Sequence, residues 1–283
     1  MKKILLVATL AALLPLLFSC GKPETDNGNV FKDPGFIQVA GRLVMRDGSP
    51  APSGTAAVSA ALAAASTTYT FVEFTESGLY VVGRLTGSET SYLTGSYTAN
   101  GNVYTLAGFG TVEISGTASP VTVTITPTGG TPEILKADYK KAAGKNVAYR
   151  GWTIDKTRAT VYGFHVPVTA DFNGCNFTEM AKFLNDNGHK GVYLPSGSLK
   201  SVSITGAESI IFAYSDNSAD VAEYTLNGSS LNFSWRAGSR LLEVENGKAT
   251  IDYLDGKCIL KIEAALKGST TSGSVTFVLS PME

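Results

Sequence analysis

The sequence predicts an all-β protein made of two tandem domains of antiparallel strands, each with a short helix. Three observations lead to this expectation. Only 17% of the 283 residues are charged, while Gly, Ser, Thr and β-branched residues are plentiful. Apolar and polar residues alternate along several segments. Similar segments also recur in the two halves of the chain, which has enough residues for two domains.

The amino terminus reads as a secretory signal over residues 1–19. Lys2 and Lys3 precede an apolar segment of about 15 residues, which is too short to span a membrane comfortably. The residues Leu17-Phe18-Ser19-Cys20 resemble the lipobox of bacterial lipoproteins. This resemblance implies that Cys20 receives a diacylglycerol and becomes the new amino terminus, anchored by its acyl chains. An ordinary secreted protein with a chance cysteine is the alternative.

Residues 20–34 are predicted to be the lipidated cysteine and a flexible tether, because they are polar and rich in turn formers. Glu24 and Asp26 partly resemble the surface-export signals of Bacteroidetes-type lipoproteins, so an outer-membrane location is expected and its face stays open. Removing residues 1–19 leaves 21 basic and 24 acidic residues, a formal charge of −3. Nucleic acid is therefore not an expected partner, since binding it calls for a basic face.

The first β domain is predicted over residues 35–130. Val121, Val123 and Ile125 alternate with threonines, and Asn100-Gly101 is a strong hairpin signal. The alanine-rich run 55–65 is this domain's candidate helix. Residues 131–144 are expected to be a helical linker, because Pro132 suits the first position of a helix and Gly144 a helix end.

The second β domain is predicted over residues 145–283. A hairpin is expected at Asn227-Gly228, and a helix over 176–187 that is capped by Asn176 and ended by Gly188. The two domains share three pairs of similar segments in the same order, at unequal offsets. The pairs are 74–78 with 214–218, 97–102 with 224–229, and 121–127 with 275–281.

Arg150-Gly151-Trp152 at the start of a strand, followed by a helix and a meander, resembles the lipocalin-like (calycin-like) domains of Bacteroidetes-type lipoproteins. In the first half, Gly41-Arg42-Leu43 stands where the Gly-x-Trp would be. The resemblance implies a barrel or half-barrel in each domain and a place in the cell envelope. It implies no particular ligand, because a shared fold does not carry function with it.

Few residues point to chemistry. His165 and His189 show no metal-ligand spacing, so no metal or cofactor is expected, and no nucleophile or phosphate-binding motif occurs. The carboxylate pairs Asp216/Asp220 and Asp252/Asp255 read as turns. Cys175 and Cys258 are open to two interpretations, a disulfide in an oxidising compartment or buried thiols. The chain is therefore expected not to be an enzyme.

Aromatic residues give the one positive indication of binding. Several alternate along predicted strands and would line a barrel or form its core. The candidate ligand-binding residues are Trp152, Tyr214, Tyr224 and Trp235. Two hypotheses follow: a non-catalytic envelope module that binds a small molecule, glycan or protein, or a structural, adhesive surface protein that contacts glycans or partner lipoproteins. A hydrolase ranks last. An open pocket above ~300 Å³ lined by these aromatics would support the first hypothesis, and a filled barrel in both domains would count against it.

Overall fold

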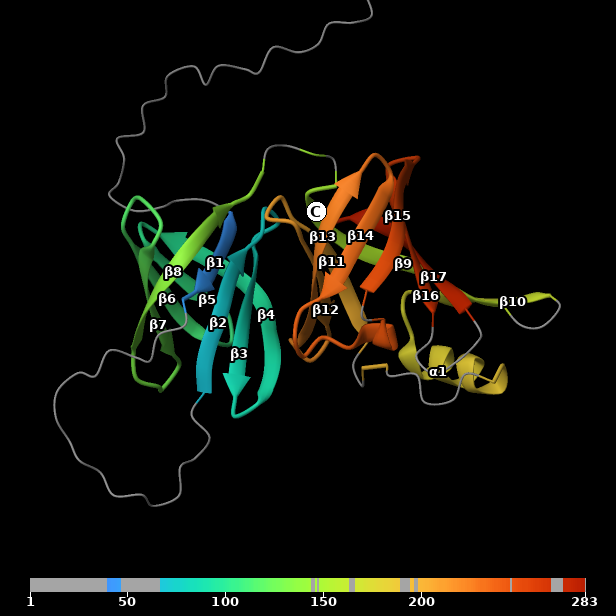
Figure 1. Cartoon of the computed structure of the whole chain (residues 1–283), viewed down its shortest axis with the longest axis horizontal. Helices are drawn as coiled ribbons and strands as arrows, with labels where there is room; N and C mark the ends of the chain where they lie inside the picture. Colours follow the sequence, from blue (N-terminus) through green and yellow to red (C-terminus); the bar gives the residue numbers. More distant parts are fainter. Residues whose placement is uncertain are drawn as a thin grey trace, which may run out of the picture. The chain divides into compact units, whose positions relative to one another are not determined.

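The computed structural model describes residues 40–46, 67–143, 146, 148–162, 166–188, 194–195, 198–244, 246–265 and 272–282. These residues form two antiparallel eight-stranded β-barrels in tandem, with one α-helix (Figure 1). The predicted all-β fold class is confirmed. The signal segment, Cys20, the tether, the run 55–65, His165 and His189 lie outside the described residues.

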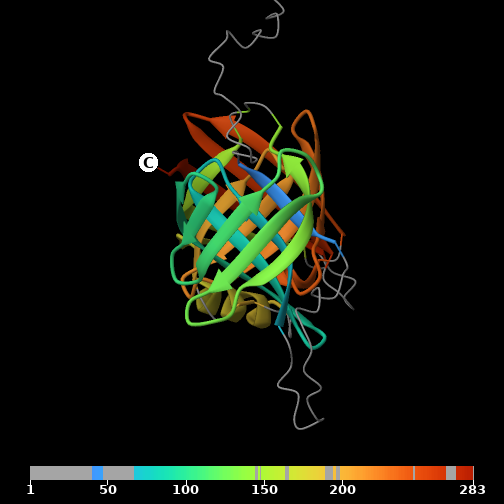
Figure 2. The same cartoon turned by 90° about the vertical axis from the view of Figure 1, so that its left-hand side faces the viewer.

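The first barrel runs in sequence order and closes on itself. Its strands are β1 (Gly41–Met45), β2 (Thr67–Phe74), β3 (Leu79–Thr86), β4 (Glu89–Asn100), β5 (Val103–Leu106), β6 (Gly110–Ser115), β7 (Val121–Pro127) and β8 (Glu133–Lys141). Antiparallel pairing of β1 with β8 completes the ring. Figure 2 shows these strands crossing the barrel wall obliquely, as closure of a small barrel requires.

Apolar side chains fill the first barrel. Val72, Val82 and Ile125 are fully buried, and the rings of Phe74 and Tyr104 lie 4.2 Å apart between centroids. Small eight-stranded barrels have an interior just wide enough for such side chains. The period-two alternation of β7 therefore packs one face inward and leaves threonines on the outer wall.

The second barrel is closed by β9, which pairs with β17 along one side and with β11 along the other. β10 pairs with the far half of β9 and extends the sheet beyond the ring. The elements are β9 (Arg150–Tyr162), β10 (Pro167–Asn173), α1 (Phe177–Asp186), β11 (Leu199–Ile204), β12 (Ser209–Tyr214), β13 (Ala219–Asn227), β14 (Ser230–Trp235), the 3-10 turn η1 (Leu241–Glu243), β15 (Asn246–Leu254), β16 (Lys257–Ala265) and β17 (Ser272–Pro281).

The helix α1 forms where the sequence predicted it. The side chain of Asn176 accepts hydrogen bonds from the N–H groups of Thr178 and Glu179, and Gly188 has a φ of 88° just past the helix end. Its apolar face packs into the core of the second barrel through Phe177, Met180 and Leu184. The cap fixes where the helix starts, and the buried face fixes how it docks.

The predicted helical linker over 131–144 is wrong. Residues 133–141 form strand β8, which pairs with β7 and β1 and belongs to the first barrel. Leu135, Ala137 and Tyr139 point inward, while the alternate residues face out. The period is therefore two, and pairing with two neighbours overrides the helix propensity of the lysines and alanine.

The duplication is real at the level of strand order, but only one of the three predicted segment pairs is equivalent. The hairpins at Gly101 and Gly228, each with a φ of 62°, both join the fourth and fifth strands of their barrels. The turn at Thr75 matches the turn at Thr205, because each threonine hydroxyl accepts a hydrogen bond from the N–H four residues on. The other two predicted matches, 74–78 with 214–218 and 121–127 with 275–281, equate segments at different positions in the strand order of the two barrels.

The two barrels share a buried cluster of apolar residues. The cluster combines outward-facing residues of both barrels: Phe71, Val81, Tyr92, Ile211, Ala219 and Val221. All six residues of β12 are buried. Its Ile-Ile-Phe-Ala-Tyr run lacks polar alternation because one face meets its own barrel and the other meets the first barrel.

Candidate functional site

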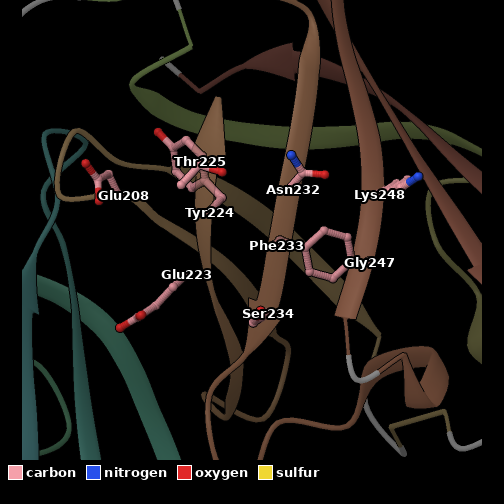
Figure 3. Close-up of a pocket in the computed structure, with 9 residues that line it drawn as sticks. All are labelled: Glu208, Glu223, Tyr224, Thr225, Asn232, Phe233, Ser234, Gly247 and Lys248. Atoms are coloured by element: carbon pink, nitrogen blue, oxygen red, sulfur yellow. The ribbon is translucent and has the colours of Figure 1, made fainter. Parts of the chain in front are cut away.

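A groove of about 490 Å³ lies on the outer wall of the second barrel, over β13, β14 and β15 (Figure 3). Its volume falls in the range of about 300–1,000 Å³ that is typical of ligand sites. The lining residues are Glu208, Glu223, Tyr224, Thr225, Asn232, Phe233, Ser234, Gly247 and Lys248. The groove is therefore a candidate site for a small ligand.

Strand alternation places the polar lining residues on the outer face. Glu223 and Thr225 flank the buried Tyr224, and Asn232 and Ser234 flank the buried Phe233. The register sets Thr225 opposite Asn232, and Asn232 opposite Lys248. With strands about 4.8 Å apart, this row spans about 10 Å. Figure 3 shows Glu208 at one end of the row and Lys248 at the other.

The floor of the groove depends on a glycine. Gly247 lies directly opposite Phe233, and a Cβ added to Gly247 would lie 2.1 Å from the Phe233 ring. The aromatic ring fills the space that a side chain would occupy, so the floor is closed by packing. Thr225, Asn232 and Ser234 are short, and the longer side chains at the two ends leave a hollow between them.

The two carboxylates of the groove are held by cations. Glu208 forms an ion pair with Lys140, and Oε1 of Glu223 accepts hydrogen bonds from Arg42, at 2.8 Å, and from Arg236. The Arg236 guanidinium lies 4.5 Å from the centroid of the Phe71 ring. Glu223 is thus fixed in orientation although about half of its side chain is exposed.

Arg42 links the groove to a buried polar network between the barrels. Its Nε donates to Glu73 at 3.0 Å, and its Nη2 donates to Ser209 at 2.5 Å and to the carbonyl of Ala207 at 2.8 Å. The Glu73 carboxylate also accepts hydrogen bonds from the hydroxyls of Thr205 and Ser209, both at 2.6 Å. Arg42 and Glu73 are 5% and 0% exposed, so this is a desolvated ion pair whose remaining oxygens are satisfied.

The aromatic residues singled out in the sequence lie in the core of the second barrel. Trp152 donates its Nε1 hydrogen to the carbonyl of Ala148 at 3.1 Å, and Tyr224 donates its hydroxyl to the carbonyl of Thr205 at 2.8 Å. Burial raises the pKa of Tyr224 above its ordinary value. Tyr224 contributes to the groove floor while its ring is buried, and Trp152 is structural.

Tyr214 and Trp235 also belong to this core. The Tyr214 hydroxyl donates to the Asp220 carboxylate at 2.7 Å. Burial raises the pKa of Asp220 above its ordinary value, while that hydrogen bond and the N–H groups of Arg240 and Leu241 oppose the shift. The Trp235 ring packs on Phe212 and Phe233, and its buried Nε1 has no hydrogen-bond partner among the residues that the structure describes. None of the four aromatic candidates presents an exposed face to the groove.

Cys175 and Cys258 are buried free thiols, which is the second of the two interpretations that the sequence left open. Burial raises the pKa of each thiol to about 12, so neither has the thiolate character of a reactive cysteine. Asp216 caps its own turn by accepting hydrogen bonds from Ser218, whereas Asp220 turns inward to Tyr214. These two carboxylates do not form a shared site.

Within the described ranges, no three His, Cys, Asp or Glu side chains lie close enough to hold a metal ion. No helix in the same part of the chain is long and apolar enough to cross a membrane. Apart from Tyr224, sequence reasoning missed the residues of the groove, because most of them are ordinary polar side chains on strands. The alternation around Phe233 was the one available signal, and it marks any solvent-facing wall.

No protein-family model matches this chain, and no curated protein matches it. Among solved structures, a double mutant of transferrin binding protein B from Haemophilus parasuis, described as a vaccine antigen, matches over 74% of this chain and 52% of its own. The sequence identity is 7% and the TM-score is 0.25. This chain spans about half the length of that protein. A likeness this low supports no inference about fold or function.

Proposed function

We propose that this chain is a non-catalytic binding module of the cell envelope, held at the outer membrane by lipid on Cys20, with the groove over β13–β15 as its ligand site. The groove carries the proposal: it has the volume of a ligand site and is rich in hydrogen-bonding groups. The barrel interiors are packed with apolar side chains, which counts against a ligand inside either barrel and leaves the outer wall as the surface with open polar groups.

The lipid anchor rests on the lipobox and the polar tether of the sequence. Non-catalytic action is favoured by the state of the groove's carboxylates. Glycoside hydrolysis uses one carboxyl group as an acid and another as a base or nucleophile. Glu208 and Glu223 are both tied to cationic side chains, an arrangement that positions a carboxylate as a fixed hydrogen-bond acceptor.

The test removes hydrogen-bonding groups from the groove without disturbing the barrel. Thr225→Val with Asn232→Leu keeps side-chain size, and both residues are exposed. The full chain is screened on an oligosaccharide array, and its hits are measured by calorimetry. We expect the double variant to lose binding and keep its unfolding midpoint. The matched control is Thr98→Val with Thr105→Val, an exposed cross-strand pair on the first barrel.

Binding that the groove variant and the control variant retain equally would refute the groove as the ligand site. An absence of binding to any array member would count against a binding module whose groove takes oligosaccharides.

A second candidate, a surface protein that contacts partner proteins, is favoured by the β9–β10 extension. Tyr162, Val166 and Val168 are exposed there, at 39%, 70% and 43%. Among the described strands β10 pairs with β9 alone, so its other edge has no strand partner there. Substituting Val166 and Val168 with Lys tests this candidate: it fails if cell-surface adhesion and co-purifying proteins are unchanged while the barrels stay folded.

A further inference from the structure

The groove's charges point to the chemistry of its ligand. Arg42 and Arg236 balance Glu73 and Glu223, and Lys140 balances Glu208. Lys248 remains. Within the described part of the chain it has no ion pair or hydrogen bond, and it lies at the end of the groove opposite Glu208. Glu263 lies opposite Lys248 on β16, and its carboxylate is paired with Lys261 at 3.7 Å. Among the described residues, Lys248 is therefore a positive charge without an ion pair at one end of the groove, which favours a ligand with a negative group there.

The other lining groups match hydroxyls. A sugar hydroxyl both donates and accepts, so it is best met by side chains of mixed character. Thr225 supplies a hydroxyl, and Asn232 supplies an amide with donors and an acceptor. The Glu223 carboxylate uses Oε1 for both arginines, which leaves Oε2 as an acceptor held in a fixed direction. The row from Thr225 to Lys248 spans about 10 Å, the reach of a short oligosaccharide and not of one small ion.

The groove gives little support to apolar or aromatic ligands. Tyr224 and Phe233 are each 4% exposed, so neither offers a ring face for stacking. A nucleotide base or an acyl chain needs such a face or an apolar pocket. Hydrogen bonds and one charge suit a ligand that is polar along its whole length.

From these observations we infer that the groove binds an acidic oligosaccharide, with the sugar carboxylate at Lys248 and the hydroxyls along Thr225, Asn232 and Glu223. This inference rests on the proposed function, because it assigns the ligand class of the same groove. The carboxylate forms a charge-assisted hydrogen bond with the Lys248 ammonium group, which is stronger than a neutral hydrogen bond.

The experiment compares carboxylated sugars with their carboxyl-reduced counterparts. The full chain is titrated with oligosaccharides that contain glucuronate, galacturonate or sialate, each beside the same oligosaccharide with the carboxyl group reduced to an alcohol. We expect at least one acidic member to bind roughly 10- to 100-fold more tightly than its reduced form. Higher salt should narrow the difference, because the charge at the barrel surface is screened.

Lys248→Met should abolish the preference for the acidic member. Lys200→Met is the matched control, since Lys200 is an exposed lysine on β11 outside the groove. Equal affinity for acidic and reduced members, lost in the Thr225→Val/Asn232→Leu variant, would overturn the acidic ligand and leave the proposed function standing. Binding to no member, or binding that ignores every groove variant, would overturn both.

Discussion

The buried ion pair between the barrels gives the sharpest test of how this molecule is held together. Arg42→Met removes the guanidinium from Glu73, a carboxylate that is 0% exposed, and leaves it with hydroxyl partners alone. Removing one partner of a buried ion pair costs about 3–5 kcal/mol, because the remaining charge stays desolvated. For a chain of this size that loss corresponds to a fall of about 6–20 °C in Tm.

The assay is urea unfolding of the full chain, followed by circular dichroism and by tryptophan fluorescence. Arg42→Met combined with Glu73→Gln removes both charges and keeps an acceptor for Thr205 and Ser209, so we expect it to recover about half of the loss or more. The control is Arg46→Met, which breaks an ion pair whose side chains are 52% and 53% exposed. Water screens that pair, so its effect should be much smaller. If Arg42→Met and Arg46→Met changed the unfolding free energy equally, the buried network would not hold the barrels.

Four further predictions concern the pH dependence of stability, the isolated second half, the lipid anchor and surface export. Because the pKa of Asp220 is raised in the folded state, its stabilising contribution is present at low pH and lost as pH rises through that pKa. Asp220→Asn should therefore flatten the pH dependence of the urea midpoint above about pH 4. An unchanged dependence of the midpoint on pH would contradict this. Residues 145–283 alone should form a strand-rich cooperative unit, because the second barrel closes within 150–281. This fragment should self-associate through Ile211 and Val221, which removal of the first barrel exposes. An unfolded fragment would show that the halves share one core. Cys20→Ser should abolish fatty-acid labelling and membrane sedimentation without unfolding the barrels; label retained by this variant would refute the lipobox. Changing Glu24 and Asp26 to Ala should reduce the surface exposure of the protein, measured by protease shaving, only if this stretch is an export signal.

Local patterns in the sequence were enough to predict the fold class, the helix and several hairpins. An Asn-Gly pair with alternating flanks fixes a turn through its own conformational preference, so the hairpins at Gly101 and Gly228 need no tertiary information. Helix α1 has a cap and a buried face within a dozen residues. Such features are short-range, and the rest of the molecule does not overrule them.

The wrong predictions concern segments whose structure depends on pairing with strands that are distant in the sequence. Strand β8 contains lysines and an alanine, which favour a helix locally, yet it pairs with β1 almost a hundred residues earlier in the chain. The matched segments 121–127 and 275–281 look alike because both are strands with one apolar face, and they occupy different places in the two barrels. The alternation of Leu135, Ala137 and Tyr139 was the signal that would have corrected the linker.

The groove could not be predicted, because it depends on register. Thr225, Asn232 and Lys248 come from three strands, and each alone is an ordinary outward-facing residue. What makes them a row is the pairing of β13 with β14 and of β14 with β15. The uninterrupted apolar run of β12 did carry information, since a strand buried on both faces requires a second layer. That layer is the first barrel.

Glu223 connects the two features that the sequence did not reveal. Its carboxylate accepts a hydrogen bond from Arg42 of the first barrel and another from Arg236, and it also forms one wall of the groove on the second barrel. Arg42 is in turn oriented by Glu73 and Ser209, so contacts between the barrels set the direction of a groove acceptor. A fragment containing the second barrel alone lacks Arg42, and its Glu223 keeps a single guanidinium partner. The first barrel therefore contributes to the proposed ligand site without lining it, by fixing one of its hydrogen-bonding groups.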